Sequence, residues 1–352
     1  MAGYISTLGV KGWTTAILLV LLGLVPAYAA YTDNAFYLDI GTRLIILAMA
    51  AVSLNLILGN GGMISFGHAG YLGIGSYAVG IPAYYEIYDG FYQIPIAIGL
   101  SASFALITGF ICLRTKGVNF IMITMAFTQM VFFGIVSIEE YGGDDGLVIE
   151  ARSELAGLID LEDNVTLFYV CFISLLAVIY LVHRVVNSRF GMVIKGAKGN
   201  ERRMQSLGFN TYKYQLAAYV LAGTICGYAG VLLGNFTGFI SPEMMDWSRS
   251  GDLIFMVVLG GTGTLFGPLF GAGAFVLLEE YLSVFINFLF PYLAGYLPSS
   301  IDLFGMQDPG TYWHLYFGMI LILVVLFVKG GIAGFLDRFS APRKNGQAGS
   351  ND

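Results

Sequence analysis

Long runs of apolar residues dominate this sequence and leave it few ways to fold. A helix that spans a bilayer needs about 20 mostly apolar residues, and about ten segments approach that length. Only 11% of the 352 residues are charged, while 57% are hydrophobic. A soluble fold could not cover its surface with so few charges, whereas lipid accepts an apolar exterior. We therefore expect an all-α polytopic membrane protein with about ten transmembrane helices, eight at the least. The expected spans are residues 13–30, 36–58, 63–81, 93–113, 118–138, 166–183, 214–233, 240–259, 265–288 and 313–328.

Two of these segments are weak candidates for a complete crossing. Residues 63–81 are short and rich in glycine, and residues 240–259 hold four charged side chains. In the second segment we expect only the part from Asp252 onward to be helical at membrane depth. Either segment can be a half-helix or a re-entrant segment that protein rather than lipid surrounds. The sequence leaves open whether residues 63–81 and 240–262 cross the bilayer completely.

These two regions share a pattern of glycines, which we call the echo. Residues 61–75 contain a Gly-Gly pair, then Phe-Gly, then a Gly-x-Gly triplet, and residues 260–273 repeat this order with nearly the same spacing. Transporters often carry such repeats, with glycine-interrupted segments close to the substrate path. Two unrelated helices that merely pack closely would show the same glycines. The echo therefore predicts an internal repeat without excluding independent packing.

The charges indicate an orientation. Seven of the 17 Lys and Arg residues lie within residues 184–213, whereas residues 139–163 hold nine acidic residues and one Arg. Basic loops stay in the cytoplasm. The expected arrangement is one transmembrane permease domain over residues 1–352, with a cytoplasmic loop at 184–213, an acidic periplasmic loop at 139–165, a cytoplasmic tail at 330–352 and both termini inside.

Several function classes find no support in the residues. No loop is long enough for an ATPase core and no GxxxxGK[ST] motif occurs, so ATP would have to bind to another chain. No nucleophile–base constellation suggests an enzyme. The three cysteines lack metal-ligand spacing, so no metal site is expected. A net charge of −6 gives no indication of nucleic-acid binding, which is typical of basic proteins.

Polar side chains within the apolar runs are the first candidates for function. Burying them in a bilayer is costly, so each is a functional candidate by default. A residue that only satisfies helix packing is the alternative, and for the histidine it is the favoured one. The roles of Glu279 and Glu280 stay open, because adjacent helical positions point in different directions. The other candidates are Asn55, Ser65, His68 and Gln129.

The basic loop contains a possible docking element. Residues 197–207 can form a short amphipathic helix that ends at Gly208, with Glu201 near its start, where a carboxylate suits the helix dipole. A loop that merely fixes orientation could be shorter and structureless. The residues alone leave both readings open.

A set of motifs in fixed order resembles a known family. They are Leu-Asn-Leu-Ile-Leu-Gly at 54–59, Gly-Met-Ile-Ser-Phe-Gly-His-Ala at 62–69, Arg-Thr-Lys-Gly at 114–117, Asp-Gly-Leu at 145–147, Asn-Glu at 200–201, Leu-Gly at 207–208 and Met-Val-Val-Leu-Gly-Gly at 256–261. Together they resemble the LivM/LivH-type permeases of branched-chain amino-acid ABC importers, in the order expected for the LivM branch. They cover about two thirds of the chain. Asn119 and Tyr141 depart from the family pattern and put the exact substrate in doubt.

The resemblance implies a type-II ABC importer in a bacterial inner membrane. The expected partners are a second, LivH-like permease chain, two cytoplasmic ATPase subunits that bind ATP and Mg, and a periplasmic substrate-binding protein. This chain would be a transport subunit without a cofactor of its own. Related permeases are thought to carry urea, amides or aromatic acids, so these remain alternative substrates. A stand-alone channel or secondary transporter is a more distant alternative.

The resemblance and the polar residues together give the expected sites. The ATPase-docking residues are Asn200, Glu201, Arg202, Arg203, Leu207 and Gly208. The candidate translocation-path residues are Asn55, Ser65, His68, Asn119, Thr124, Gln129, Gly260 and Gly261. The candidate outer-mouth residues are Gly143, Asp144 and Asp145.

Overall fold

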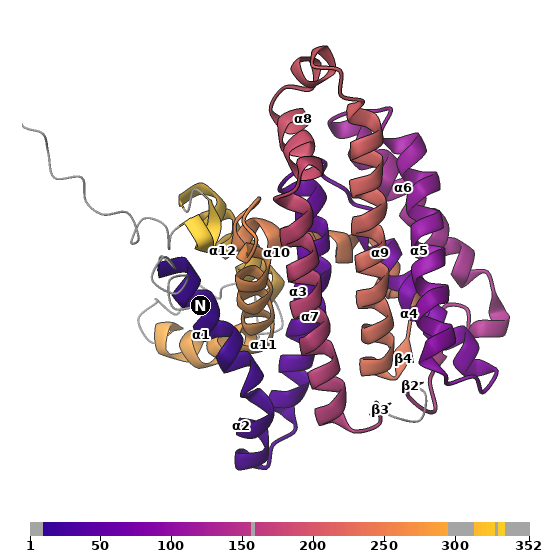
Figure 1. The fold of residues 1–352 in the computed structure, drawn as a ribbon. Coiled ribbons are helices and arrows are strands. Elements are labelled where there is room, and N and C mark those ends of the chain that lie inside the picture. The colour runs from indigo at the N-terminus through magenta and orange to yellow at the C-terminus, as the bar shows by residue number, and fades with distance from the viewer. Residues whose placement is uncertain (1–9, 156–158, 295–312, 328–329, 335–352) are drawn as a thin grey trace, which may run out of the picture.

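The computed structural model describes residues 10–155, 159–294, 313–327 and 330–334, and these form a helical bundle (Figure 1). Short strands and 3-10 turns occur only in the connections between the helices of the described part. The helices are α1 (Val10–Gly23), α2 (Val25–Thr32), α3 (Phe36–Leu58), α4 (His68–Tyr84), α5 (Gly90–Cys112), α6 (Val118–Val136), α7 (Asn164–Val186), α8 (Arg189–Ser206), α9 (Thr211–Thr237), α10 (Trp247–Gly260), α11 (Gly267–Ala294) and α12 (Trp313–Phe327). The remaining elements are η2 (Glu139–Tyr141), β1 (Leu147–Val148), β2 (Glu154–Leu155), β3 (Ile159–Asp160), β4 (Phe239–Ile240) and η3 (Pro242–Met245).

Six helices in the described residues are long and apolar enough to cross a membrane. They are α3, α5, α6, α7, α9 and the Gly267–Phe288 part of α11. Helices α1 and α2 make a seventh if they count as one span, because they meet at a bend of 44°. The expected count of about ten is therefore not confirmed. The difference arises because α4, α10 and the described α12 are only 17, 14 and 15 residues long.

The two weak segments are broken helices, as the glycines and charges indicated. The chain from Gly59 to Gly67 is not helical, and α4 begins only at His68. In the second segment, β4 and η3 precede α10. Helix α10 begins at Trp247, five residues before the expected start at Asp252, because Asp246 caps it by accepting a hydrogen bond from the Ser248 amide. Both segments thus place a helix start inside the bundle.

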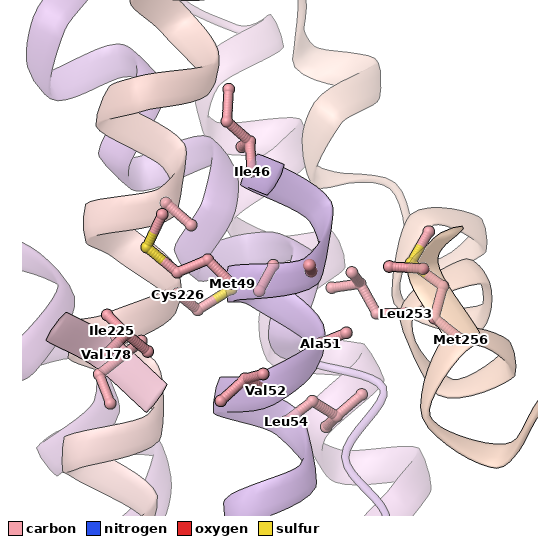
Figure 2. Packing of buried hydrophobic residues seen from close by; sticks show 14 of the residues in the cluster. Ile46, Met49, Ala51, Val52, Leu54, Val178, Ile225, Cys226, Leu253 and Met256 are labelled. Atoms are coloured by element: carbon pink, nitrogen blue, oxygen red, sulfur yellow. The ribbon is translucent and has the colours of Figure 1, made fainter. Parts of the chain in front are cut away.

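Helix α3 is the core of the described bundle, and sixteen of its residues are buried. Figure 2 shows its Met49 and Val52 beside Ile225 and Cys226 of α9, while Leu253 and Met256 of α10 lie on another side. A helix that is apolar all round must be enclosed by other helices or by lipid. Helices α7, α9, α10 and α11 do this for α3.

Helices α4 and α9 approach so closely that their backbones touch. A methyl group on Gly75 would overlap the carbonyl oxygen of Gly227, and one on Gly230 would overlap the carbonyl oxygen of Leu72. Small residues let membrane helices pack by dispersion alone, because lipid supplies no hydrophobic drive between them. These glycines therefore fix the position of the short helix α4.

We expect Gly230→Ala to destabilise the protein, because the new methyl group has to push α4 away from α9. Overpacking of this kind costs about 1–3 kcal/mol, which should lower the melting temperature in detergent and the yield of folded protein. Gly99→Ala on α5 is the matched control, since a methyl group there meets nothing within 4 Å. It should leave stability unchanged or raise it slightly. Equal melting temperatures for the two variants would contradict the close-packing account.

Candidate functional site

The starts of α4 and α10 meet in the interior of the bundle. The Ala69 amide, in the first turn of α4, donates a hydrogen bond to Oγ of Ser250 in α10 at 2.9 Å. Ser250 is fully buried. The first amides of a helix have no partner within the helix, so a hydroxyl from the other helix satisfies one of them. This contact joins the two broken segments that the sequence marked as weak spans.

Two of the predicted path residues support the extended segment that precedes α4. Thr124 Oγ1 on α6 accepts a hydrogen bond from the Phe66 amide at 3.2 Å, and Ser65 Oγ accepts one from the Gly67 amide at 3.2 Å. Both side chains are buried. They replace helix hydrogen bonds that this segment lacks, and such replacement is required in a water-free interior. Their role in a translocation path stays a prediction.

His68 lies at the same junction and is fully buried. Its ring packs edge-on against Tyr71, with 5.5 Å between the ring centroids. Within the described residues neither ring nitrogen has a hydrogen-bond partner. The side chain lines neither of the two larger cavities described below. Its role in helix packing, as opposed to proton transfer, stays a prediction.

Asn55 joins the two glycine-rich loops that carry the sequence echo. Its Oδ1 accepts a hydrogen bond from the Gly263 amide at 2.9 Å, and its Nδ2 donates to the Thr264 carbonyl at 2.7 Å. The first loop connects α3 to α4, and the second connects α10 to α11. Each copy of the echo therefore forms a helix–loop–helix unit, and the two loops lie at the same end of the bundle.

Of the predicted path residues, Gly260 is the last residue of α10 and Gly261 is the first residue of the second loop. Gly261 has a φ of 114°, which L side chains rarely adopt. Gly260 lies directly against the backbone of Gly267 at the start of α11. Both glycines are thus used to turn the chain and to pack it. Asn119, by contrast, lies exposed near the start of α6, away from the junction.

Gln129 connects α6 to the start of α10. Its Nε2 donates a hydrogen bond to Oδ1 of Asp246 at 2.9 Å. Asp246 belongs to the wall of a cavity of about 810 Å³ formed by α6, η3, α10, α11 and α12. Sequence reasoning noted the charges of α10 only as an obstacle to a spanning helix and did not place them around a cavity.

An ion pair explains one of the glutamates that the sequence left open. Arg43 Nη2 on α3 donates to Oε1 and Oε2 of Glu279 on α11, at 2.8 and 2.9 Å. The two residues lie 236 positions apart in the sequence. Pairing makes both charges tolerable between apolar helices. Glu280 is half-buried.

At the α8 end of the bundle, the predicted docking helix exists in a modified form. The expected helix over residues 197–207 is interrupted at Asn200, whose φ of −157° and ψ of 99° are not helical. The Asn200 side chain accepts a hydrogen bond from the Arg203 amide at 3.0 Å and so caps a new short helix. This helix ends before Gly208, which has a φ of 87°. Arg202, Arg203 and Leu207 are exposed on it.

Glu201 turns back toward the bundle. Its carboxylate forms an ion pair with Lys116 in the α5–α6 loop and accepts a hydrogen bond from Thr211 Oγ1 at 3.1 Å. On the other side of the Asn200 break, Lys198 Nζ donates to the Gly59 carbonyl at 2.7 Å. The two halves of α8 therefore hold two different loops of the membrane helices. The sequence showed Lys198 as one of the basic residues that indicate orientation and Lys116 as part of the motif at 114–117, without partners for either.

The contacts of α8 surround a second cavity of about 410 Å³. Its walls include Gly62 and Met63 of the α3–α4 loop, Lys116 of the α5–α6 loop, and Lys198 and Glu201 of α8. A shift of either half of α8 would change its shape. None of the predicted path residues lines it.

The predicted outer-mouth residues lie at the opposite end, after α6. Gly143 is buried with a φ of 50°, while Asp144 and Asp145 are exposed. The acidic segment continues through β1, which pairs with β4, and through β2 and β3, to Asp163 at the start of α7. Hydrogen bonds from the Thr166 hydroxyl and amide hold the pKa of Asp163 below its usual value. These residues form an exposed, negatively charged surface.

Known proteins of one family are similar to most of this chain. The family described as "Branched-chain amino acid transport system / permease component" matches residues 36–328. The high-affinity branched-chain amino acid transport system permease protein LivM of Salmonella typhimurium is 25% identical over 280 residues, which cover 73% of this chain and 66% of that protein. LivM of Escherichia coli K12 matches with the same identity and coverage. LivH of E. coli K12 is 26% identical over 121 residues, 34% of this chain and 38% of that protein.

The chain thus spans just under two thirds of the length of the LivM relatives. No solved structure matches it. The family match includes both glycine-rich loops, the broken helix α8 and the charged cavity, and the apolar helices make the protein a multi-pass membrane protein. This chain belongs to the family of branched-chain amino-acid transport permeases, as a member of the LivM type.

Proposed function

We propose that this chain is a transmembrane subunit of an ATP-driven importer that moves branched-chain or related amino acids. The observation that carries this proposal is the family match over residues 36–328, together with relatives named as branched-chain amino acid transport permeases. Matches to both LivM and LivH support a second permease chain as the partner. Two ATPase subunits with ATP and Mg, and a periplasmic binding protein, complete the proposed assembly.

The proposed orientation places the α8 end in the cytoplasm of a bacterial cell. Seven of the 17 Lys and Arg residues lie in residues 184–213, around α8, and basic loops remain inside. The acidic surface at the other end then faces the periplasm, where the binding protein docks. Both chain termini are cytoplasmic in this arrangement.

The ATPase subunits dock on the short helix after Asn200. Arg202, Arg203 and Leu207 are exposed there, so a partner can contact them directly. Glu201 has a different task, because its carboxylate is engaged with Lys116 and Thr211 of this chain. It transmits movement of the docking helix to the α5–α6 loop and to α9. Coupling through a rigid element of this kind needs such a fixed connection.

Uptake of labelled leucine, in cells with and without this chain, tests the proposed function. We expect uptake to require the chain, to stop when ATP is depleted and to survive collapse of the proton gradient, because the partner ATPases supply the energy. Loss of uptake on gradient collapse alone would indicate a secondary carrier. ATP-dependent uptake of urea, amides or aromatic acids in place of leucine would keep the importer and change its substrate.

A reciprocal charge swap tests the connection through Glu201. Glu201→Lys and Lys116→Glu each place like charges side by side, which at an exposed pair costs about 1 kcal/mol, so each should lower leucine uptake by about fivefold. The double variant restores the ion pair and should recover most of the uptake. Membrane insertion, measured by the amount of chain in the membrane fraction, should be equal in all three.

The alternative is a direct contact between Glu201 and an ATPase subunit. In that case Lys116→Glu would leave uptake unchanged, and the double variant would be as defective as Glu201→Lys. Either result would contradict a connection within the chain. Glu201 would then be assigned to the surface that contacts the ATPase subunits.

A further inference from the structure

The cavity of about 810 Å³ is a half-open space between helices, and it combines charged and aromatic walls. Phe132 of α6, Phe255 of α10, Phe275 of α11 and Phe317 of α12 supply the aromatic part. Ionisable side chains at membrane depth are costly and are typical of substrate or ion pathways. Binding sites for small molecules have this composition, with apolar walls and a few polar groups that fix orientation.

Charges of both signs remain available in the cavity. Arg43 neutralises Glu279 through its two hydrogen bonds. Arg249 lies 3.7 Å from Asp252, and half of its side-chain surface is exposed, so this contact is loose. Glu243 and Asp246 lie on the same wall as Arg249. Two carboxylates and one guanidinium therefore face a shared space at the start of α10.

We propose that this cavity is a substrate subsite that takes a free amino acid in its zwitterionic form. Arg249 binds the carboxylate, Asp246 and Glu243 bind the ammonium group, and the phenylalanines contact an aliphatic side chain. The subsite deepens the proposed import function and rests on it. A volume of about 810 Å³ exceeds what one amino acid fills. Contacts in it are therefore moderate, as a ligand in transit requires.

The charge balance selects among the related substrates. The cavity wall holds four carboxylates and one arginine, and Arg43 offsets one carboxylate from outside the wall. This surplus of negative charge disfavours an acid that lacks an ammonium group. Neutral urea and amides can form hydrogen bonds to these groups but no ion pair with either of them. An α-amino acid alone uses both signs.

Structural duties of these residues can be separated from substrate binding. Asp246 also caps α10 through Oδ2 and accepts from Gln129 through Oδ1. An asparagine keeps the cap with its single oxygen, and its Nδ2 can donate to Gln129 once the Gln129 amide turns its oxygen toward it. Within the described residues the ion pair of Arg249 is an exposed i,i+3 pair with Asp252, and such pairs contribute about 0–1 kcal/mol to stability. Asp246→Asn and Arg249→Gln should therefore fold and remove only charge.

The first experiment uses the complete importer with its binding protein. We expect Arg249→Gln and Asp246→Asn each to lower leucine uptake by about tenfold to a hundredfold, the worth of a charge-assisted hydrogen bond. Assembly of the complex and ATP hydrolysis stimulated by the binding protein should persist. Arg249→Lys should retain more uptake than Arg249→Gln. Asp39→Asn, an exposed acid on α3 outside the cavity, is the matched control and should transport normally.

The second experiment measures occupancy. Gly318 lines the cavity, a side chain there meets nothing within 4 Å, and the native Cys112, Cys171 and Cys226 are buried, so Gly318→Cys introduces a reactive thiol over a low background. A membrane-impermeant maleimide should label it more slowly in the presence of ATP and leucine-loaded binding protein than with leucine-free binding protein. This protection should disappear when Arg249→Gln is added, which separates occupancy from a change of conformation.

Three results would overturn the subsite. They are normal uptake by Arg249→Gln, equal labelling with and without leucine, and loss of complex assembly in both charge-removing variants, which would make the cavity an interface between subunits. Each presupposes that the unaltered importer carries leucine. If it does not, the proposed function fails instead, so the two failures are distinguishable.

Discussion

The structure depends on satisfying backbone amides where its helices break. In a bilayer no water reaches these groups, so an unpaired amide costs several kcal/mol. Thr124 and Ser65 accept from the amides before α4, Ser250 accepts from the first turn of α4, and Asn55 accepts from the loop before α11. Each break is therefore held by a side chain, usually from another helix. The breaks in turn bring two helix starts into the middle of the bundle.

This arrangement decides where the charged side chains at the start of α10 lie. Glycine contacts bring the backbones of α4 and α9 directly together. The charges of α10 instead face the space toward α6, α11 and α12. A substrate route on that side of the chain agrees with a permease that works beside a second one. The buried Ser65 and His68 do not line this cavity, so the proposed subsite does not include them.

The α8 end carries the proposed coupling. The break at Asn200 divides α8 into one part held to the α3–α4 loop by Lys198 and another held to the α5–α6 loop by Glu201. Directly before the α3–α4 loop, Asn55 near the end of α3 holds the α10–α11 loop. A force applied to the exposed arginines thus reaches both glycine-rich loops through direct contacts. Helices packed as tightly as α4 and α9 move as units, so such a force would shift α4 as a whole.

The sequence by itself determined the membrane class, the positions of the long spans, the broken nature of two segments and the family. These features depend on run length, local charge and glycine spacing, which the chain carries in order. Only the tertiary structure decided that Arg43 pairs with Glu279, that Glu201 turns to Lys116, and that the α10 charges surround a cavity. These partners are 236 and 85 positions apart or lie on different helices. No local pattern encodes which faces of separate helices will meet, because that follows from how all the helices pack together.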